Sequence, residues 1–201
     1  MGENQVIVPE IPEAVKNKIF SASDIKWVKN VNDDDPKRGV TYCSAYIPQD
    51  PRVITNANGI FFYLQLNQKL RGFKNNLLVA NIGDLILLHQ KLNNQQTKCF
   101  THLVTPVDNN VILKPYNPNN PVEWPGRLVK VIAMTENQAG KSIPLISTDW
   151  HTMQFTGDHY DLSYNQGRIR GIAHNQQVSN QQLSKLQNNI WNKFQQGGWL
   201  K

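Results

Sequence analysis

The sequence predicts an α+β fold, in which a small curved β-barrel of five or six strands is flanked by helices. Two observations lead to this prediction. Most of the β-prone segments lie in the middle of the chain, and the clearest helical patterns lie near its two ends. The 201 residues are enough for one domain with a sizeable core, or for a domain with extensions. We expect residues 1–23 to be an N-terminal helical extension and residues 24–201 to form the domain.

Two helices are expected near the ends of the chain. The first covers residues 12–21, where Pro12 suits the first turn of a helix. The second covers residues 178–194, where Ser179 can serve as the N-cap and Gln182 follows three residues later. The apolar residues of this second helix recur at helical spacing and form one stripe: Leu183, Leu186, Ile190 and Phe194.

Six segments have the composition and alternation of strands, namely residues 25–31, 59–66, 85–90, 99–107, 127–134 and 167–174. Two further segments are shorter or less regular, residues 40–47 and 111–116. In the first strand, alternation predicts that Trp27 shares a face with Ile25 and Lys29, and that Asn30 points to the opposite face. Residues 115–126 contain four prolines and are expected to be a loop.

The composition favours a polyanionic partner. The formal net charge is +6 and the sequence pI is about 9.3, which suits nucleic acid or an anionic membrane surface. No segment approaches the roughly 18 apolar residues of a membrane span, and the first residues lack the pattern of a signal peptide. The cysteines, Cys43 and Cys99, each stand alone, which argues against a disulfide scaffold or a cysteine-rich zinc site. We therefore expect a cytoplasmic protein with no membrane partner.

The order of three apolar segments then indicates a family. IKWVKNV, LLVANIGDLILLHQK and CFTHLVTPV follow one another in a sequence of elements that resembles the PUA-like superfamily, and within it the EVE and YTH-related branch. The glycine–aspartate pair that enters an apolar strand in this family is Gly83-Asp84 here. The closing YNQGRIRGIAHNQQVSNQQLSKL is also similar to the end of EVE domains. The resemblance covers about residues 24–194 and rests on pattern and order.

This resemblance implies a β-barrel that binds DNA or RNA by base flipping, with a modified base held in an aromatic pocket. Trp27 and Asn30 match the opening strand of the family. The segment GVTYCSAYIPQDPR is similar to the wall of the YTH pocket, and Trp124 is similar to an aromatic residue that precedes a late strand. The implied pocket residues are Trp27, Asn30, Tyr42, Cys43, Ser44 and Trp124. Tyr42 departs from the YTH pattern, which has tryptophan at this position.

Reading a flipped base requires aromatic faces, amide or backbone groups for its edge, and cations for the neighbouring phosphates. The candidate phosphate-binding residues are Lys26, Lys29, Lys37, Arg38, Arg168 and Arg170. Arg168 and Arg170 flank Ile169 in a strand, so they are expected to share the outer face. The competing interpretation is that Trp27 is a core residue and that the cations form a solvated face.

Histidine and aspartate are concentrated in residues 147–164, but their spacing matches no known metal site. This segment is interpreted as a loop, either part of a pocket wall or plain surface. The sequence also lacks a Walker loop, a GxSxG motif and a convincing cysteine–histidine pair. We therefore expect no cofactor, no metal and no catalytic residue.

Two other functions stay open. One is a small ribonuclease or amide hydrolase of the related ASCH branch, which needs a lysine, a tyrosine and a serine or glutamate in one cleft; Lys37, Tyr42 and Ser44 are its candidates. The other is a protein-interaction module that uses the Asn/Gln-rich surface. Many base-reading modules steer an effector such as a nuclease, and 201 residues leave little room for one in this chain, so the effector would be a separate partner protein.

Overall fold

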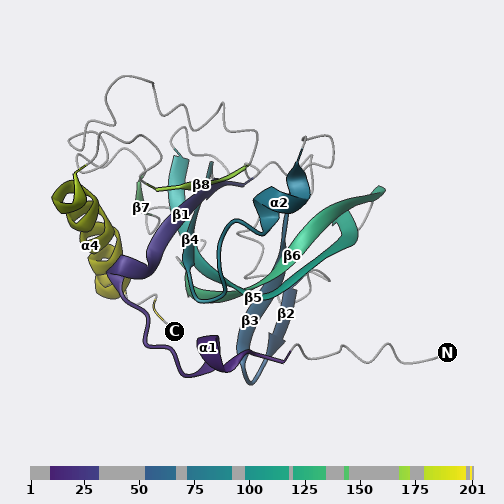
Figure 1. Cartoon of the computed structure of the whole chain (residues 1–201), viewed down its shortest axis with the longest axis horizontal. Helices are drawn as coiled ribbons and strands as arrows, with labels where there is room; N and C mark the ends of the chain where they lie inside the picture. Colours follow the sequence, from purple (N-terminus) through teal and green to yellow (C-terminus); the bar gives the residue numbers. More distant parts are fainter. Residues whose placement is uncertain are drawn as a thin grey trace.

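The computed structural model describes residues 10–31, 53–66, 72–91, 98–117, 120–134, 143–144, 168–172, 179–197 and 200. These residues form a curved mixed sheet with helices around it (Figure 1). The elements follow in the order α1 (Glu13–Lys16), η1 (Ala22–Asp24), β1 (Ile25–Asn30), β2 (Val53–Asn56), β3 (Gly59–Gln65), α2 (Phe73–Leu77), β4 (Leu85–Lys91), β5 (Lys98–Asn117), β6 (Asn120–Met134), β7 (Ile143–Pro144), β8 (Ile169–Gly171) and α4 (Asn180–Gln196). The predicted α+β class is confirmed.

The sheet has the strand order β2-β3-β6-β5-β4-β1-β8, and β7 pairs with β5. The β1–β4 pair is parallel, and the other pairs are antiparallel. The predicted number of five or six strands is too low. Closure into a barrel is also wrong for the described part of the chain, because no pairing there joins β2 to β8.

Side-chain hydrogen bonds connect α2 and the residues after it to β8, at one end of the sheet, and to β6, the third strand from the other end. The amide of Asn76 donates to the carbonyl of Ile169 (2.8 Å) and accepts from its N–H (2.9 Å), so it satisfies the outer edge of β8. On the other side, the guanidinium of Arg127 in β6 donates to the carbonyl oxygens of Leu77 (3.0 Å) and Ala80 (2.6 Å). Helix α2, which the sequence did not predict, therefore connects β8 to β6.

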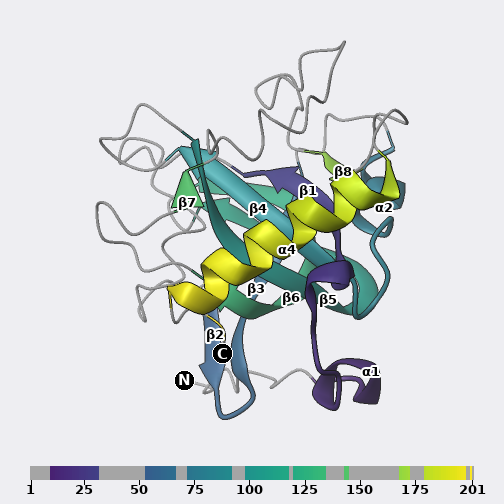
Figure 2. The same ribbon diagram turned by 90° about the vertical axis from the view of Figure 1, so that its left-hand side faces the viewer.

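The core has two sides. One cluster packs under α4 and includes Leu87, Ile190 and Phe194, and we call this side of the sheet the outer face (Figure 2). Another cluster draws residues from β2 and β3 at one end of the sheet and from β1 and β8 at the other. Because strands at both ends contribute to it, this cluster lies on the concave side, which we call the inner face.

A bulge in β1 decides which of its side chains face inward. Ile25 pairs with Leu85, and Trp27 pairs with Ile86, so β1 advances by two residues while β4 advances by one. Ile25 consequently faces outward, where its carbonyl oxygen accepts from Gln187 of α4 (2.9 Å), whereas Trp27 packs on the inner face. The prediction that Ile25 and Trp27 share a face is wrong for this reason.

The two predicted helices differ in how well they match the structure. Helix α4 begins after the predicted N-cap Ser179, and both contacts of the capping box with Gln182 are present. The predicted helix over residues 12–21 is much shorter, because α1 covers Glu13–Lys16 only. Val15 of α1 is buried against Phe61 and its neighbours. The division of the chain at residue 24 stays a prediction.

The expected loop over residues 115–126 is instead part of the β5–β6 hairpin. β3 stops pairing with β6 at Gly126, and β4 stops pairing with β5 at Val104. Among the described residues, no third strand pairs with the hairpin beyond these points, although the carbonyl oxygen of Pro125 accepts from the N–H of Leu66 (3.0 Å). The missing N–H groups of Pro115 and Pro125 therefore interrupt no third strand there. Among the described residues, no helix is long and apolar enough to span a membrane.

Candidate nucleic-acid interface

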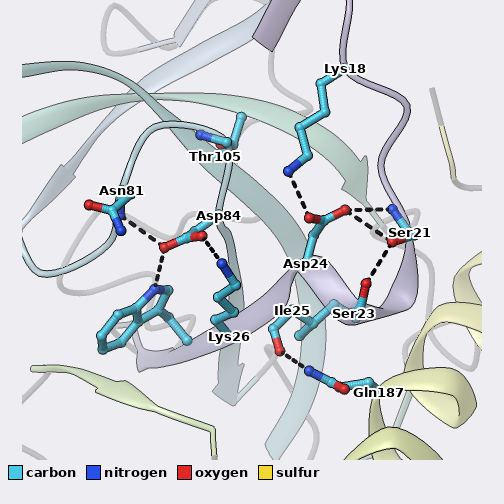
Figure 3. A network of polar contacts seen from close by, with 12 residues as sticks. Lys18, Ser21, Ser23, Asp24, Ile25, Lys26, Asn81, Asp84, Thr105 and Gln187 are labelled. Carbon is cyan, nitrogen blue, oxygen red and sulfur yellow. Dashed lines mark hydrogen bonds and ion pairs between the residues drawn. The ribbon is translucent and has the colours of Figure 1, made fainter. Parts of the chain in front are cut away.

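Asp84 is the centre of a polar network beside the first strand. The preceding Gly83 has φ +88°, a left-handed conformation that glycine adopts without strain, and this turn brings the carboxylate of Asp84 to β1. Its oxygens accept hydrogen bonds from the backbone N–H of Asn81 (3.0 Å), the indole Nε1 of Trp27 (3.0 Å) and Nζ of Lys26 (2.7 Å), as Figure 3 shows. The Gly83-Asp84 pair thus connects β4 to β1.

The ionisation of Asp84 follows from these contacts. Burial opposes the charged form, but the hydrogen bonds from Lys26, Trp27 and Asn81 outweigh it and hold the pKa of this carboxyl below its usual value. The same pair raises the pKa of Lys26, mainly through its hydrogen bond to Asp84. Both groups are therefore charged at neutral pH.

Trp27 is held by this network and is partly exposed. Its indole packs against the inner-face cluster, and its N–H is satisfied by Asp84. Gly171 of β8 lies directly across from Trp27, and no described atom lies within 4 Å of the place where a Cβ of residue 171 would stand. Trp27 is thus partly a core residue, as the competing interpretation held, and one with space beside it at the edge of the sheet.

The candidate cations are distributed over different surfaces. The side chain of Lys26 is 54% exposed, so its ammonium has donors to spare beyond Asp84. Arg168 and Arg170 flank Ile169, whose side chain is buried on the inner face, so alternation places both arginines on the opposite face. Their shared face, which the sequence predicted, lies at the edge strand next to β1.

Lys29 is the residue whose placement differs most from expectation. It shares the face of Trp27, as alternation predicted, but it is only 3% exposed, so its interpretation as a phosphate-binding surface cation is wrong. It lies between Ile169 and Leu88 in a row across the inner face, and Leu88 is followed in the same row by His102. Nζ of Lys29 donates to the carbonyl oxygen of Asn30 (3.3 Å).

Burial perturbs both ionisable groups of this row. It lowers the pKa of Lys29 from its ordinary value to about 7 and that of His102 to about 3. His102 is therefore neutral, with Nδ1 beside the hydroxyl of Thr101 (2.9 Å) and its ring edge-on to Phe62. A lysine that is only half protonated near neutrality is a frequent mark of a functional site. In the sequence, the signal that could have pointed to Lys29 as a site residue was its position two residues after Trp27 in the same strand.

The two other pocket candidates that the structure describes, Asn30 and Trp124, do not lie beside Trp27. Asn30 follows Lys29 and points to the opposite face, as alternation predicted. Trp124 lies across from Lys114 in the hairpin, and its register places it on the face of Leu128, which belongs to the cluster beside α1. Tyr42, Cys43, Ser44, Lys37, Arg38 and residues 147–164 lie outside the described residues.

The described part of the chain has no group of three or more His, Cys, Asp or Glu side chains that could hold a metal ion. No protein-family model matches the chain, and no curated protein or solved structure compared with it matches either. The candidate site therefore depends on its own geometry: an anchored tryptophan, an adjacent edge strand with a glycine, and a buried lysine on the same face.

Proposed function

We propose that this chain is a nucleic-acid-binding module that reads a modified base flipped against Trp27. It would belong to the PUA-like superfamily, near the EVE and YTH-related domains. The observation that carries the proposal is Trp27 itself: its ring is fixed by Asp84, and the position opposite it in the edge strand is a glycine. An aromatic ring fixed before binding offers a stacking face at little entropic cost.

The charges near this tryptophan support the same function. Lys26 is next to it in sequence, and Arg170 lies on the neighbouring edge strand, with its side chain on the face opposite to the indole. A strand of nucleic acid that passes over β8 could place its phosphates near these cations while one base turns toward the indole. The net charge of +6 would add long-range attraction. A cytoplasmic location and a separate effector protein stay part of this proposal.

The test is a binding screen with modified and unmodified oligonucleotides, both DNA and RNA, at two salt concentrations. Trp27→Ala should weaken binding by about 1–3 kcal/mol, the usual contribution of one stacked base. Trp191→Ala, which truncates a partly buried tryptophan on α4, is the matched control and should leave affinity unchanged. Affinity should fall steeply as salt rises, whereas a protein-interaction module would bind none of the oligonucleotides. Absence of binding to every oligonucleotide would refute the proposal.

A second candidate is an ASCH-like ribonuclease or amide hydrolase, and Lys29 favours it. An amine with a pKa of about 7 can act as a general base near neutral pH, which an exposed lysine cannot do efficiently. This candidate predicts turnover of RNA or of a small amide by the purified protein, and loss of turnover in Lys29→Met or Lys37→Ala. Binding without turnover would favour the reader.

A further inference from the structure

The edge of β8 that faces away from β1 carries backbone groups directed outward. In an antiparallel pair, the N–H and C=O groups of successive residues point alternately toward the neighbouring strand and away from it. Ile172, directly after β8, donates its N–H inward to the carbonyl oxygen of Lys26 (2.8 Å). Ile169 directs both of its groups outward, where the amide of Asn76 binds them. Gly171 is two residues after Ile169, so its N–H and carbonyl oxygen also point outward.

Asn76 shows what kind of group this outer edge binds. Its side-chain amide is planar and places a donor beside an acceptor. It donates to the carbonyl oxygen of Ile169 (2.8 Å) and accepts from the N–H of the same residue (2.9 Å). Gly171 offers the same pair of groups about 6.8 Å farther along the strand. In the part of the chain that the structure describes, no contact uses them, so a second planar group with the same pattern can bind there.

The backbone groups of Gly171 lie beside the candidate stacking residue. Gly171 is partly exposed, and no described atom lies within 4 Å of the place where its Cβ would stand. Trp27 lies directly across from it in β1. Because the outward groups of Gly171 are not bonded to Trp27, this is the closer kind of antiparallel pair, with Cα atoms about 4.5 Å apart. The outward groups and the indole therefore belong to one place at the edge of the sheet.

The unused part of this edge is too short for a peptide strand. A peptide that adds to the edge of a sheet does so through a series of backbone pairs. β8 spans only Ile169–Gly171, and Asn76 already binds the groups of Ile169. Among the described residues of β8, the N–H and C=O of Gly171 are what remains, and they match one planar group. A nucleobase is such a group, because its edge places hydrogen-bond donors and acceptors side by side.

We propose that the backbone N–H and carbonyl oxygen of Gly171 bind the edge of the base that Trp27 contacts. An acceptor of the base takes the N–H of Gly171, and an adjacent donor of the base binds its carbonyl oxygen, as Asn76 does at Ile169. The ligand is therefore a base whose edge is not engaged in pairing, in a single strand or flipped out of a duplex. This inference rests on the proposed function and adds the group that binds the base edge.

The experiment uses short single strands in which one central base is flanked by abasic nucleotides, and a fully abasic strand is the reference. Adenine, cytosine, guanine, thymine and the modified base preferred in the binding screen each occupy the central position. The ratio of the affinities for a base-bearing strand and for the abasic strand measures what the base contributes. This ratio is compared between the wild type and three variants.

The variants separate the N–H of Gly171 from other effects of substitution. Gly171→Pro removes the N–H without removing a bond to β1, and an edge strand tolerates proline where the N–H points outward. Gly171→Ala adds a side chain but keeps the N–H. Thr55→Pro changes an exposed residue of β2, the edge strand at the other end of the sheet, and is the control for proline itself.

In the wild type, stacking and hydrogen bonding together should make the ratio about 100-fold for at least one base. Gly171→Pro should reduce this ratio about tenfold relative to Gly171→Ala, and Thr55→Pro should leave it unchanged. Amide hydrogen exchange gives a measurement that requires no variant. The N–H of Gly171 should exchange about tenfold more slowly with the base-bearing strand than with the abasic strand, because it gains an acceptor.

Equal ratios in Gly171→Pro and Gly171→Ala would overturn this inference and leave the reader function intact. An exchange rate of the Gly171 N–H that does not depend on the base would have the same consequence, even if Gly171→Pro fails to fold. Failure of the wild type to bind any oligonucleotide would overturn both this inference and the proposed function.

Discussion

Substitution of Asp84 by alanine tests whether one carboxylate holds the candidate site together. The change removes the acceptor for the indole of Trp27, the N–H of Asn81 and the ammonium of Lys26. The contact with Lys26 contributes little, since that side chain is half exposed. The contacts from Trp27 and Asn81 are hydrogen bonds to a charged and buried acceptor, and each contributes about 1–2 kcal/mol to the free energy of unfolding. We expect Asp84→Ala to lower the free energy of unfolding by about 2–4 kcal/mol, which corresponds to a Tm decrease of roughly 5–15 °C.

The assay combines thermal unfolding with NMR of the tryptophan indole N–H groups, in which Trp27→Phe assigns the Trp27 signal. Asp84→Ala should shift and broaden that signal, because the ring loses its anchor. Asp24→Ala is the matched control: Asp24 also pairs with a lysine, Lys18 (2.7 Å), and its carboxylate accepts further hydrogen bonds from Ser21 (Figure 3). The reasoning would be refuted by an unshifted Trp27 signal in Asp84→Ala, or by the same shift in Asp24→Ala.

The pH dependence of this stabilisation has a definite sign. The pKa of Asp84 is lower in the folded protein than in the unfolded chain, where it is about 3.9. Its contribution to stability is therefore fully present above the unfolded pKa and is lost as the pH falls through the folded pKa. The difference in stability between wild type and Asp84→Ala should consequently be constant near neutral pH and should shrink below about pH 4.

Three further predictions concern other parts of the fold. Arg127→Met should lower the free energy of unfolding by about 3 kcal/mol or more in chemical denaturation, because the buried carbonyl oxygens of Leu77 and Ala80 lose their donor. Lys130→Met in the same strand is the control and should change this free energy little. Ser179→Ala should cost about 1 kcal/mol in the same assay and should fray the first turn of α4, and an effect as small as that of Ser184→Ala would contradict the capping role. Lys29→Met should raise the Tm at pH 7 and below, where burial of the protonated amine destabilises the wild type. The difference in Tm between the variant and the wild type should shrink as the pH rises from 7 toward 10. A difference in Tm that does not change with pH would show that Lys29 is not buried in the way described.

The sequence predicted elements where local pattern and tertiary packing agree. Helix α4 is the clearest case, since its apolar stripe and its capping box are both local signals and both are used in the structure. The turn at Gly83 and the strand that follows it are another, because the glycine and the apolar run specify them directly. The prolines of residues 115–126 misled the prediction, since whether proline disrupts a strand depends on neighbouring strands that the local sequence does not reveal.

The candidate site was harder to predict than the fold, for a physical reason. The facing of every side chain in β1 depends on one bulge near Lys26, and an unbroken alternation would have placed Ile25 with Trp27. Burial of Lys29 also depends on strands that come from distant parts of the sequence, β8 and β4. Neither the bulge nor this pairing has a local signature, so Lys29 was interpreted as a surface cation.

Hydrogen bonds at both ends of β8 keep this edge strand attached to β1 beside the candidate site. β8 has only three residues, and a strand of this length contributes little stability by pairing alone. The amide of Asn76 occupies its outer edge at Ile169, and the N–H of Ile172 donates to the carbonyl of Lys26 (2.8 Å). Gly171 is therefore fixed between these two attachments, directly across from Trp27. The position that a stacked base would approach is thus held by hydrogen bonds on both sides, and no described atom lies within 4 Å of the place where a Cβ of residue 171 would stand.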